Sequence, residues 1–454
     1  MSLLPLAPSW VGERTGVTLA LDRPGVTLAL RRNPRRAHLL VSALLGKHQP
    51  VPAAAVLDAA TELGALVRAA VGGAPSYVVG FAETATALGH AVARVSGPGG
   101  GPAPYAHTTR RPLPDGLTGL SFQEEHSHAV EQLLAVADED PLTDPGRILV
   151  LVDDELSTGR TAVNAIAVLQ QRWPRTTYVL ACLLDVRSPA QQALNVAEVA
   201  ALGARLVSVS LATGQVTLPA DLGSTAAALL ADLDQPAHDQ PAHDQPAHDR
   251  PADGPATVSL RPAAPVSEWA LGLTAPLTGA HGWTPADEDA LTVATRALAA
   301  QLVLAGTGLA GTGLAGTALA GTALAGSVLV LGDEEFLYAG QRLALALGPQ
   351  ACTSSTTRSP ALVLDVPGYP LRTALTFGAT DDPERAAYAY NVRPSSAPDR
   401  GPAPGFEHIV LLLDRPVPAH TRDRLLPQLA AAATTGVVVV VVSAADALTV
   451  RRTA

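Results

Sequence analysis

ILVLVDDELSTGRTA, residues 148–162, joins a continuous aliphatic run to two adjacent carboxylates and a turn of small polar residues. Such a run is typical of a parallel strand that is buried on both faces. In the turn, Gly159 allows close backbone approach, while hydroxyls, Arg160 and the first N–H groups of a following helix can donate to an anion. The stretch therefore predicts a strand, a phosphate-binding turn and a helix.

The two carboxylates, Asp153 and Asp154, need a separate explanation, because they would repel a phosphate held by the turn. The two carboxylates could instead bind sugar hydroxyls of the same ligand, or an Mg²⁺ ion that this ligand carries. The alternative is an acidic strand end followed by an ordinary helix cap.

The first half of the chain alternates strand-like and helix-like segments, which predicts an α/β fold with a mostly parallel sheet covered on both faces. In such sheets ligands bind beyond the carboxyl ends of the strands. The strand candidates are GVTLAL (twice), SYVVG, RILVLVD, TTYVLACLLD and ARLVSVSL, and the helix candidates include residues 53–71, 84–95 and 160–173.

The composition narrows the class of protein. The chain has 454 residues, which predicts two domains, and a net charge of −10 without a basic cluster, which argues against nucleic-acid binding. Its two cysteines, Cys182 and Cys352, lack metal-ligand spacing and indicate a reducing compartment. With no apolar run long enough to span a bilayer and no signal peptide, we expect a cytoplasmic protein without a membrane partner.

Two repeats divide the chain. Residues 234–256 repeat the letters DQPAH and predict a disordered linker, so we expect a first domain at 1–220, a linker at 221–260 and a second domain at 261–454. The LAGT repeat at 304–327 has a period of five, which fits neither helix nor strand, and reads as an inserted loop or a poor helix extension.

The opening stretch resembles the phosphoribosyl pyrophosphate (PRPP) motif of type I phosphoribosyltransferases. The resemblance implies that Asp153 and Asp154 contact the ribose hydroxyls of PRPP and the Mg²⁺ ion that PRPP carries. It also implies a 5′-phosphate loop. Some base-salvage members carry an acid at the position of Ser157, and this chain does not. Its pattern is therefore nearer to the orotate type, which puts a purine-salvage role in doubt. The loop residues are Ser157, Thr158, Gly159, Arg160 and Thr161.

Two other stretches fit the same family. GFAETATALG would hold the pyrophosphate of PRPP, and HTTRR matches a mobile hood whose arginines could neutralise the departing pyrophosphate. The only lysine, Lys47, is a further candidate contact. The expected pyrophosphate-binding residues are Gly80, Glu83, Thr84, Thr86, Lys47 and Arg111, with Arg110 as a catalytic candidate.

With EEHSH at 124–128 and a later STTRSP, the chain is similar to the phosphoribosyltransferases of bacterial tellurium-resistance-type gene clusters, whose second domain is named for a Thr-Arg-Ser-Pro motif. In that family a nucleoside-like metabolite is the expected product. Glu125 and His126 are candidates for acid/base work or metal ligation, with ordinary polar packing as the alternative.

The second half repeats the motif order of the first: strand–Gly–acid–helix, Thr-Thr-Arg, and then an aliphatic strand that ends in Asp. We therefore expect two Rossmann-like doubly wound domains, the second a diverged phosphoribosyltransferase-like copy. It has no glycine turn after Asp414 and should have lost PRPP binding. Its expected site residues are Glu334, Glu335, Thr357 and Arg358.

The sequence thus predicts an Mg²⁺-dependent phosphoribosyltransferase that joins PRPP to a small nitrogenous acceptor, and a homodimer is one assembly open to it. A PRPP-sensing binding protein without turnover is the main alternative. A hydrolase or lyase acting on a ribosyl phosphate is a third. The acceptor cannot be read from these motifs.

Overall fold

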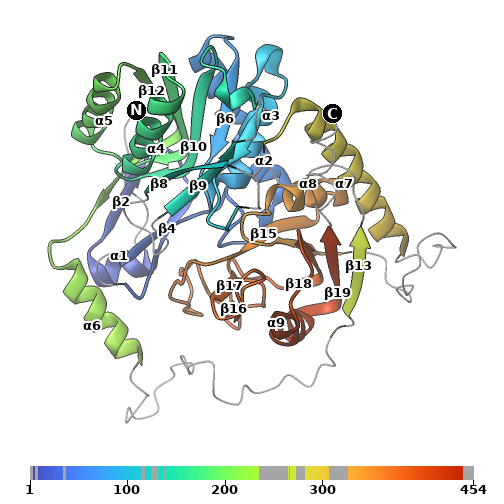
Figure 1. The fold of residues 1–454 in the computed structure, drawn as a ribbon. Coiled ribbons are helices and arrows are strands. Elements are labelled where there is room, and N and C mark those ends of the chain that lie inside the picture. Colours follow the sequence, from blue (N-terminus) through green and yellow to red (C-terminus); the bar gives the residue numbers. More distant parts are fainter. Residues whose placement is uncertain are drawn as a thin grey trace.

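Two sheets, one in each half of the chain, form the framework of the molecule (Figure 1). None of the helices that are described is both long and apolar enough to cross a bilayer. The computed structural model describes residues 4–5, 9–33, 37–113, 118–123, 131–136, 140–234, 264, 266–271, 282–305 and 326–442.

The first sheet has the strand order β1-β2-β12-β11-β10-β6-β7, and its five strands from β12 to β7 are parallel, as the sequence predicts. β2, from the first GVTLAL, lies antiparallel to β12. The second GVTLAL forms β3 outside this sheet, paired only with β4 in a hairpin. The bounds are β1 Leu4–Pro5, β2 Thr18–Leu21, β3 Val26–Leu30, β4 His38–Ser42, β6 Ser76–Gly80, β7 Tyr105–His107, β10 Ile148–Leu156, β11 Thr177–Asp185 and β12 Arg205–Thr217.

Helices cover both faces of this sheet because successive strand residues point to opposite sides. Val150 and Val152 of β10 pack with α2 (Ala53–Val71) and α3 (Ala85–Ser96). Leu149 and Leu151 pack on the other side with α4 (Arg160–Arg172) and α5 (Pro189–Ala201). The predicted doubly wound arrangement of the first domain is confirmed.

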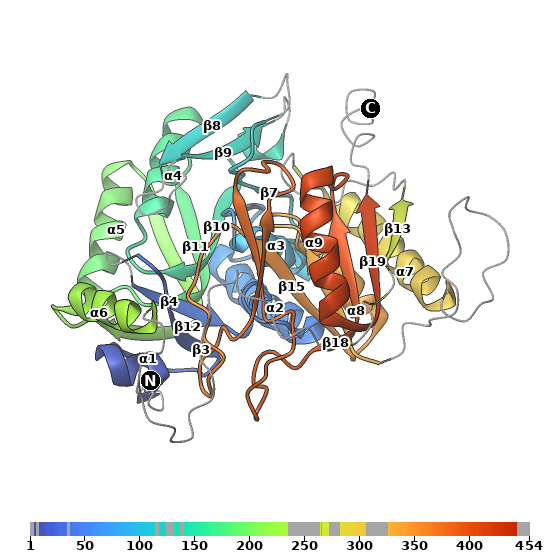
Figure 2. The same ribbon diagram turned by 90° about the horizontal axis from the view of Figure 1, so that it is seen from below.

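The second sheet has the order β13-β19-β18-β14-β15-β17-β16. Its strands from β13 to β15 are parallel, and β17 and β16 follow antiparallel. α7 and α8 pack on one face and α9 on the other (Figure 2). The bounds are β13 Val266–Leu271, β14 Val328–Gly332, β15 Ala351–Thr357, β16 Ala374–Gly378, β17 Ala386–Tyr390, β18 Phe406–Leu413, β19 Ala433–Val442, α7 Pro285–Ala305, α8 Tyr338–Leu347 and α9 Ala419–Ala432.

The two halves share one hydrophobic core. The helices α2 and α3 of the first half lie beside α7 and α8 of the second (Figure 1). Side chains from all four helices belong to a single buried cluster. In addition, β5 (Val51–Pro52) leaves the first half and pairs antiparallel with β15 of the second sheet. Because burial is shared, neither half presents a complete core of its own at this contact.

The predicted start of the linker at residue 221 is wrong. Leu222–Asp234 forms helix α6, and its residues Leu222, Ala226 and Leu230, spaced by four, are buried against the first half together with α1 (Trp10–Thr15). This one-sided apolar spacing stabilises a helix where composition alone suggested a linker. Residues 235–260 of the predicted linker and 306–325 of the LAGT repeat lie outside the described residues.

Helix α7 precedes the LAGT repeat and extends into its first residues. Thr284 acts at its start: the Thr284 hydroxyl accepts from the Asp287 N–H at 3.4 Å, and the Asp287 carboxylate accepts from the Thr284 N–H at 2.7 Å. This reciprocal pair satisfies two backbone donors at the helix start.

Candidate functional site

The sequence motifs meet at one edge of the first sheet. β6, β7 and β10 are neighbours, with Gly80 opposite both Val152 and His107, so the segments that follow these strands leave the sheet side by side. The Phe81 N–H donates to the Val152 carbonyl at 3.0 Å, which fixes the segment after β6 beside the acid pair. This edge is the carboxyl end of parallel strands, where ligands bind in such folds.

Asp153 and Asp154 lie near the end of β10 and are both partly exposed. The Asp153 carboxylate accepts from the Asp154 N–H at 3.0 Å. As neighbours in a strand the two side chains point to opposite faces, so they can approach one ligand from two directions. Both carboxylates are accessible to a ligand above the sheet edge.

The turn after the acids depends on Gly159. Its φ of +73° is in the left-handed region, and a Cβ atom there would lie 2.4 Å from Asn195 Oδ1. The Thr158 hydroxyl accepts from the Arg160 N–H at 3.3 Å, and Ser157 is exposed. The turn therefore runs directly into α4, and the role of residues 157–161 as a 5′-phosphate loop stays a prediction.

A buried ion pair supports this turn from beneath and was not predicted. The Arg187 guanidinium donates to Asp185 at 3.0 and 2.7 Å and to Asn195 at 3.0 Å. Asp185 ends β11 and Asn195 lies on α5, so the cluster links two elements to the back of Gly159. In the sequence, the only sign of this ion pair is Asp185, the carboxylate at the end of the aliphatic run that forms β11.

Arg160 forms an ion pair with Glu198 of α5 at 3.4 Å. The side chains are 40% and 29% exposed, so the pair is worth little and Arg160 can exchange it for an anion.

The segment after β6 holds the predicted pyrophosphate contacts together. Gly80 is needed there because a Cβ atom would lie 2.5 Å from the Ala85 carbonyl oxygen. Lys47 Nζ donates to the Thr84 hydroxyl and lies 3.5 Å from Glu83 Oε1. Thr86 is turned away from this group, since its hydroxyl donates to the Glu83 and Glu335 carbonyls, both at 3.3 Å.

Glu83 is buried, and burial alone would raise the pKa of its carboxyl group. The charge of Lys47, the Thr357 hydroxyl and the charges of Arg110 and Arg358 outweigh burial and lower that pKa. Glu83 is therefore an anion that orders the cations around it, rather than a proton donor.

The HTTRR segment faces the second half of the chain. The Thr109 hydroxyl and the Arg110 N–H both donate to the Glu335 carboxylate, at 2.6 and 2.9 Å. The Arg111 guanidinium lies 2.9 Å from Asp414 and 3.2 Å from Asp333. The predicted role of Arg111 as a pyrophosphate contact stays a prediction, and its observed partners are carboxylates of the second half.

The four residues expected to form a site in the second domain lie where that domain meets the first half, and their role as a site stays a prediction. Glu335, Thr357 and Arg358 contact the first half, whereas Glu334 pairs with Arg358 at 2.9 Å and Arg385 at 2.8 Å. Burial, followed by the charge of Glu83, raises the Glu334 pKa to about 7. Motif spacing could not reveal that these side chains meet the other domain.

After HTTRR, the strands β8 (Thr118–Gln123) and β9 (Glu131–Val136) form a hairpin beside α4 (Figure 2). Gln132 of β9 accepts from the Thr108 hydroxyl and donates to the Ala82 carbonyl at 3.0 Å, which ties the hairpin to the segment after β6. Between the two strands, Glu124, Glu125, His126 and His128 lie outside the described residues.

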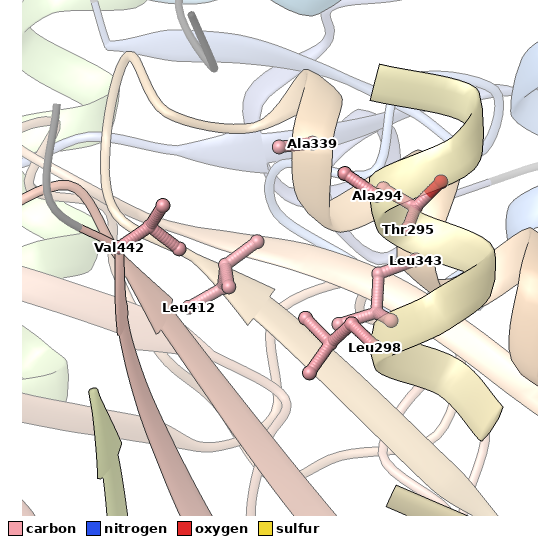
Figure 3. A pocket seen from close by; sticks show the side chains of 7 residues that line it. All are labelled: Ala294, Thr295, Leu298, Ala339, Leu343, Leu412 and Val442. Carbon is pink, nitrogen blue, oxygen red and sulfur yellow. The ribbon is translucent and has the colours of Figure 1, made fainter. Parts of the chain in front are cut away.

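A small apolar cleft between α7, α8, β18 and β19 is not part of this site (Figure 3). It has room for about one water molecule, far less than a ligand pocket provides. Its lining is Ala294, Thr295, Leu298, Ala339, Leu343, Leu412 and Val442.

Within the described ranges, no three His, Cys, Asp or Glu side chains gather as a metal site. Asp153 and Asp154 do suit Mg²⁺, which proteins often bind through one or two carboxylates while substrate phosphates and water supply the other oxygens.

His48, next to Lys47, provides a test of the packing at this site. Burial, and then the charges of Lys47 and Arg31, lower the His48 pKa well below 6.5. The neutral form therefore contributes stability above about pH 6.5. Below that value the free energy of unfolding falls by up to about 1.4 kcal/mol per pH unit while His48 stays neutral.

We expect His48→Phe to lose less stability than the wild type between pH 7.5 and 5.5 in urea unfolding. His420→Phe, at an exposed position on α9, is the control, and equal losses in all three proteins would contradict the assignment.

The comparisons with known proteins agree with this geometry. Residues 26–215 match the family model described as phosphoribosyl transferase, and residues 277–429 match the TRSP domain, described as C-terminal to that transferase domain. The chain carries a phosphoribosyl transferase domain followed by a TRSP domain. It is thus an enzyme of the phosphoribosyltransferase class, within the glycosyltransferases.

Three solved structures are similar over part of the chain. Adenine phosphoribosyltransferase of Giardia lamblia, with 9-deazaadenine, is 20% identical, with 41% of this chain and 92% of that chain covered and a TM-score of 0.29. The enzyme of Saccharomyces cerevisiae is 13% identical (41% and 94% covered, TM-score 0.28). A hypoxanthine phosphoribosyltransferase of Staphylococcus aureus is 16% identical (33% and 71% covered, TM-score 0.22). The comparison with curated proteins gave no match. The class assignment rests on the family match.

Proposed function

We propose that the transferase domain binds PRPP with Mg²⁺ at the carboxyl ends of β6, β7 and β10 and transfers its phosphoribosyl group to a nitrogen of a small acceptor. The observation that carries this proposal is the meeting of the acid pair, the Gly159 turn and the segment after β6 at one sheet edge. In this arrangement the 5′-phosphate, the ribose hydroxyls and the pyrophosphate each have a matching group.

In the reaction, the bond between C1′ and the pyrophosphate oxygen breaks and its electron pair leaves with pyrophosphate. The acceptor nitrogen forms the new bond to C1′ and gives up a proton. Bound Mg²⁺ would neutralise charge that develops on the leaving group. The residues supply position and charge: Asp153 and Asp154 orient the ribose, and residues 157–161 anchor the phosphate.

Cations beside the leaving group complete the proposed site. Lys47 is held by Glu83 and Thr84, so its ammonium group is fixed near the segment expected to hold pyrophosphate. The Arg110 backbone is fixed by Glu335. We place Arg110 among the groups that stabilise the departing pyrophosphate, with Glu125 and His126 of the EEHSH motif as acid/base candidates.

The finer parts of the proposal rest on the motif resemblance. Ser157 stands where an acid assists the base in some salvage members, so we propose an acceptor outside purine salvage. We also propose a nucleoside-like product of the tellurium-resistance type. The two free cysteines fit a cytoplasmic location.

Pyrophosphate release tests the proposal. The full chain, Mg²⁺ and PRPP are incubated with purines, pyrimidines and small amines, and pyrophosphate is measured with and without each acceptor. Release that requires one acceptor class and Mg²⁺ is the expected result. PRPP binding without release from any acceptor would favour a PRPP sensor, and release that needs only water would favour a hydrolase.

A further inference from the structure

Four parallel strands of each domain follow the same plan; the fifth, β12 or β13, lies at the same end of each sheet but comes after the other four in the first domain and before them in the second. In the transferase domain the order is β11-β10-β6-β7, and in the TRSP domain it is β19-β18-β14-β15. When each set is numbered along the chain, both orders read 4-3-1-2, and all neighbours are parallel. A helix follows the first and third strand of each set: α3 and α4 in one domain, α8 and α9 in the other.

The correspondence extends to the register. Gly80, at the end of β6, lies opposite Val152 and His107, and Gly332, at the end of β14, lies opposite Leu412 and Ser355. Tyr105 of β7 and Thr353 of β15 therefore occupy matching positions, paired with Val78 and Val330.

Each of these matching positions pairs with the other domain. Tyr105 bridges antiparallel to Trp283, just before α7, and Thr353 pairs antiparallel with Val51, just before α2. Each domain thus pairs the residue two positions before the start of its first long helix with the second strand of the other.

The polar contacts are also exchanged. Glu335 of the TRSP domain accepts from the Thr109 hydroxyl at 2.6 Å and from the Arg110 N–H at 2.9 Å. In return, Glu83 of the transferase domain accepts from the Thr357 hydroxyl and, at 3.3 Å, from the Arg358 N–H. In register, Glu83 corresponds to Glu335, and the pair Thr109–Arg110 corresponds to Thr357–Arg358. Each domain therefore makes the same contact with the other.

Reciprocal contacts of this kind define the interface of a two-fold symmetric dimer. We propose that the TRSP domain is a diverged second copy of the transferase fold that takes the place of a partner subunit, and that its Glu335, Thr357 and Arg358 are positioning residues which hold the pyrophosphate-binding segments of the transferase domain. This inference rests on the proposed function of that domain.

The same symmetry leads us to expect no PRPP site at the end of β18. Asp414, directly after β18, matches Asp154 of β10 in register, but Arg415 and Pro416 follow it instead of a glycine turn. Arg111 of the transferase domain fills this place, at 2.9 Å from Asp414 and 3.2 Å from Asp333. The chain therefore has one PRPP site, and the second copy serves the first.

The positioning role follows from what the exchanged contacts hold. Glu335 fixes the backbone at Thr109 and Arg110, and Thr357 with Arg358 fixes Glu83, which in turn holds Lys47. The TRSP domain also holds the Lys47 backbone directly, because the Ser354 hydroxyl donates to the Lys47 carbonyl at 3.2 Å. Loss of these contacts should loosen the pyrophosphate segments and leave Asp153 and the 157–161 turn unchanged.

Calorimetric titration of Mg²⁺–PRPP into near-isosteric variants of the full chain tests this inference. Glu335→Gln and Thr357→Val should each weaken PRPP binding by about tenfold, since each removes a hydrogen bond to a charged group. The affinity for ribose 5-phosphate, which lacks pyrophosphate, should change by less than about twofold. A purely structural role would weaken both ligands together.

Arg385→Ala is the matched control, because the Arg385 guanidinium pairs with Glu334 and Asp381 inside the TRSP domain. Its PRPP affinity should stay at the wild-type value, and the wild type should bind one PRPP per chain. Wild-type affinity in both Glu335→Gln and Thr357→Val, or two PRPP sites per chain, would overturn the inference while the proposed function stands. A well-folded wild type that binds no PRPP would overturn the proposed function itself.

Discussion

Replacing Arg111 with alanine is expected to lower the free energy of unfolding by about 3 to 5 kcal/mol, because it removes a buried cation that several carboxylates share and leaves buried Asp333 without its arginine partner. Arg111 lies close to Asp414, Asp333, Asp381 and Glu334 of the TRSP domain. Burial alone would lower the pKa of Arg111, but Asp414 and Asp333 raise it, so the guanidinium is charged at every accessible pH.

Urea unfolding of the full chain measures this effect. Arg111→Met should cost nearly as much as Arg111→Ala, since the methionine restores bulk without charge. Arg23→Ala is the control: Arg23 pairs with Glu62 at 2.7 Å on the surface, with side chains 38% and 52% exposed, and should cost less than about 1 kcal/mol. A loss below about 1 kcal/mol in Arg111→Ala would contradict the view that this arginine joins the two domains.

The second large effect is expected on ligand binding. Asp153→Asn combined with Asp154→Asn should weaken Mg²⁺–PRPP binding by about 100-fold, since each carboxylate contributes charge-assisted contacts. Because both side chains are partly exposed, the free energy of unfolding should change by less than about 0.5 kcal/mol. Calorimetric titration and urea unfolding separate the two effects.

Asp144→Asn provides the matched control for the acid pair. Asp144 precedes the opposite, amino end of β10, and its carboxylate pairs with Arg147 at 3.3 Å on the surface. PRPP affinity should stay at the wild-type value in this variant. Similar losses from Asp144→Asn and from the double variant would mean that the acid pair acts only through net charge.

The parts of the fold that the sequence predicts are those encoded locally. An aliphatic run, two acids and a glycine turn are consecutive, so ILVLVDDELSTGRTA predicts β10, the turn and α4 correctly. The capping pair at Thr284 is likewise local and marks the start of α7. Apolar spacing would also have revealed α6, but the neighbouring repeat drew its residues into the predicted linker.

What the sequence did not show depends on contacts between distant residues. Arg111 and Asp414 are about 300 positions apart, and nothing local distinguishes an arginine that faces a phosphate from one that faces buried carboxylates. Arg187 and Asn195 support Gly159 through the packing of α5 against the turn, which no motif records. The repeated motif order did suggest two related domains, but motif order carries no information on how the two copies face each other.

The measurement that tests the central claim most directly is the titration of PRPP with Mg²⁺ into the wild-type chain. The account predicts one PRPP bound per chain, with micromolar affinity of about −8 kcal/mol and a dependence on Mg²⁺. A well-folded chain that gives no binding heat at several temperatures, and no protection against thermal unfolding by PRPP, would contradict it. The edge formed by β6, β7 and β10 would then serve a different phosphate ligand.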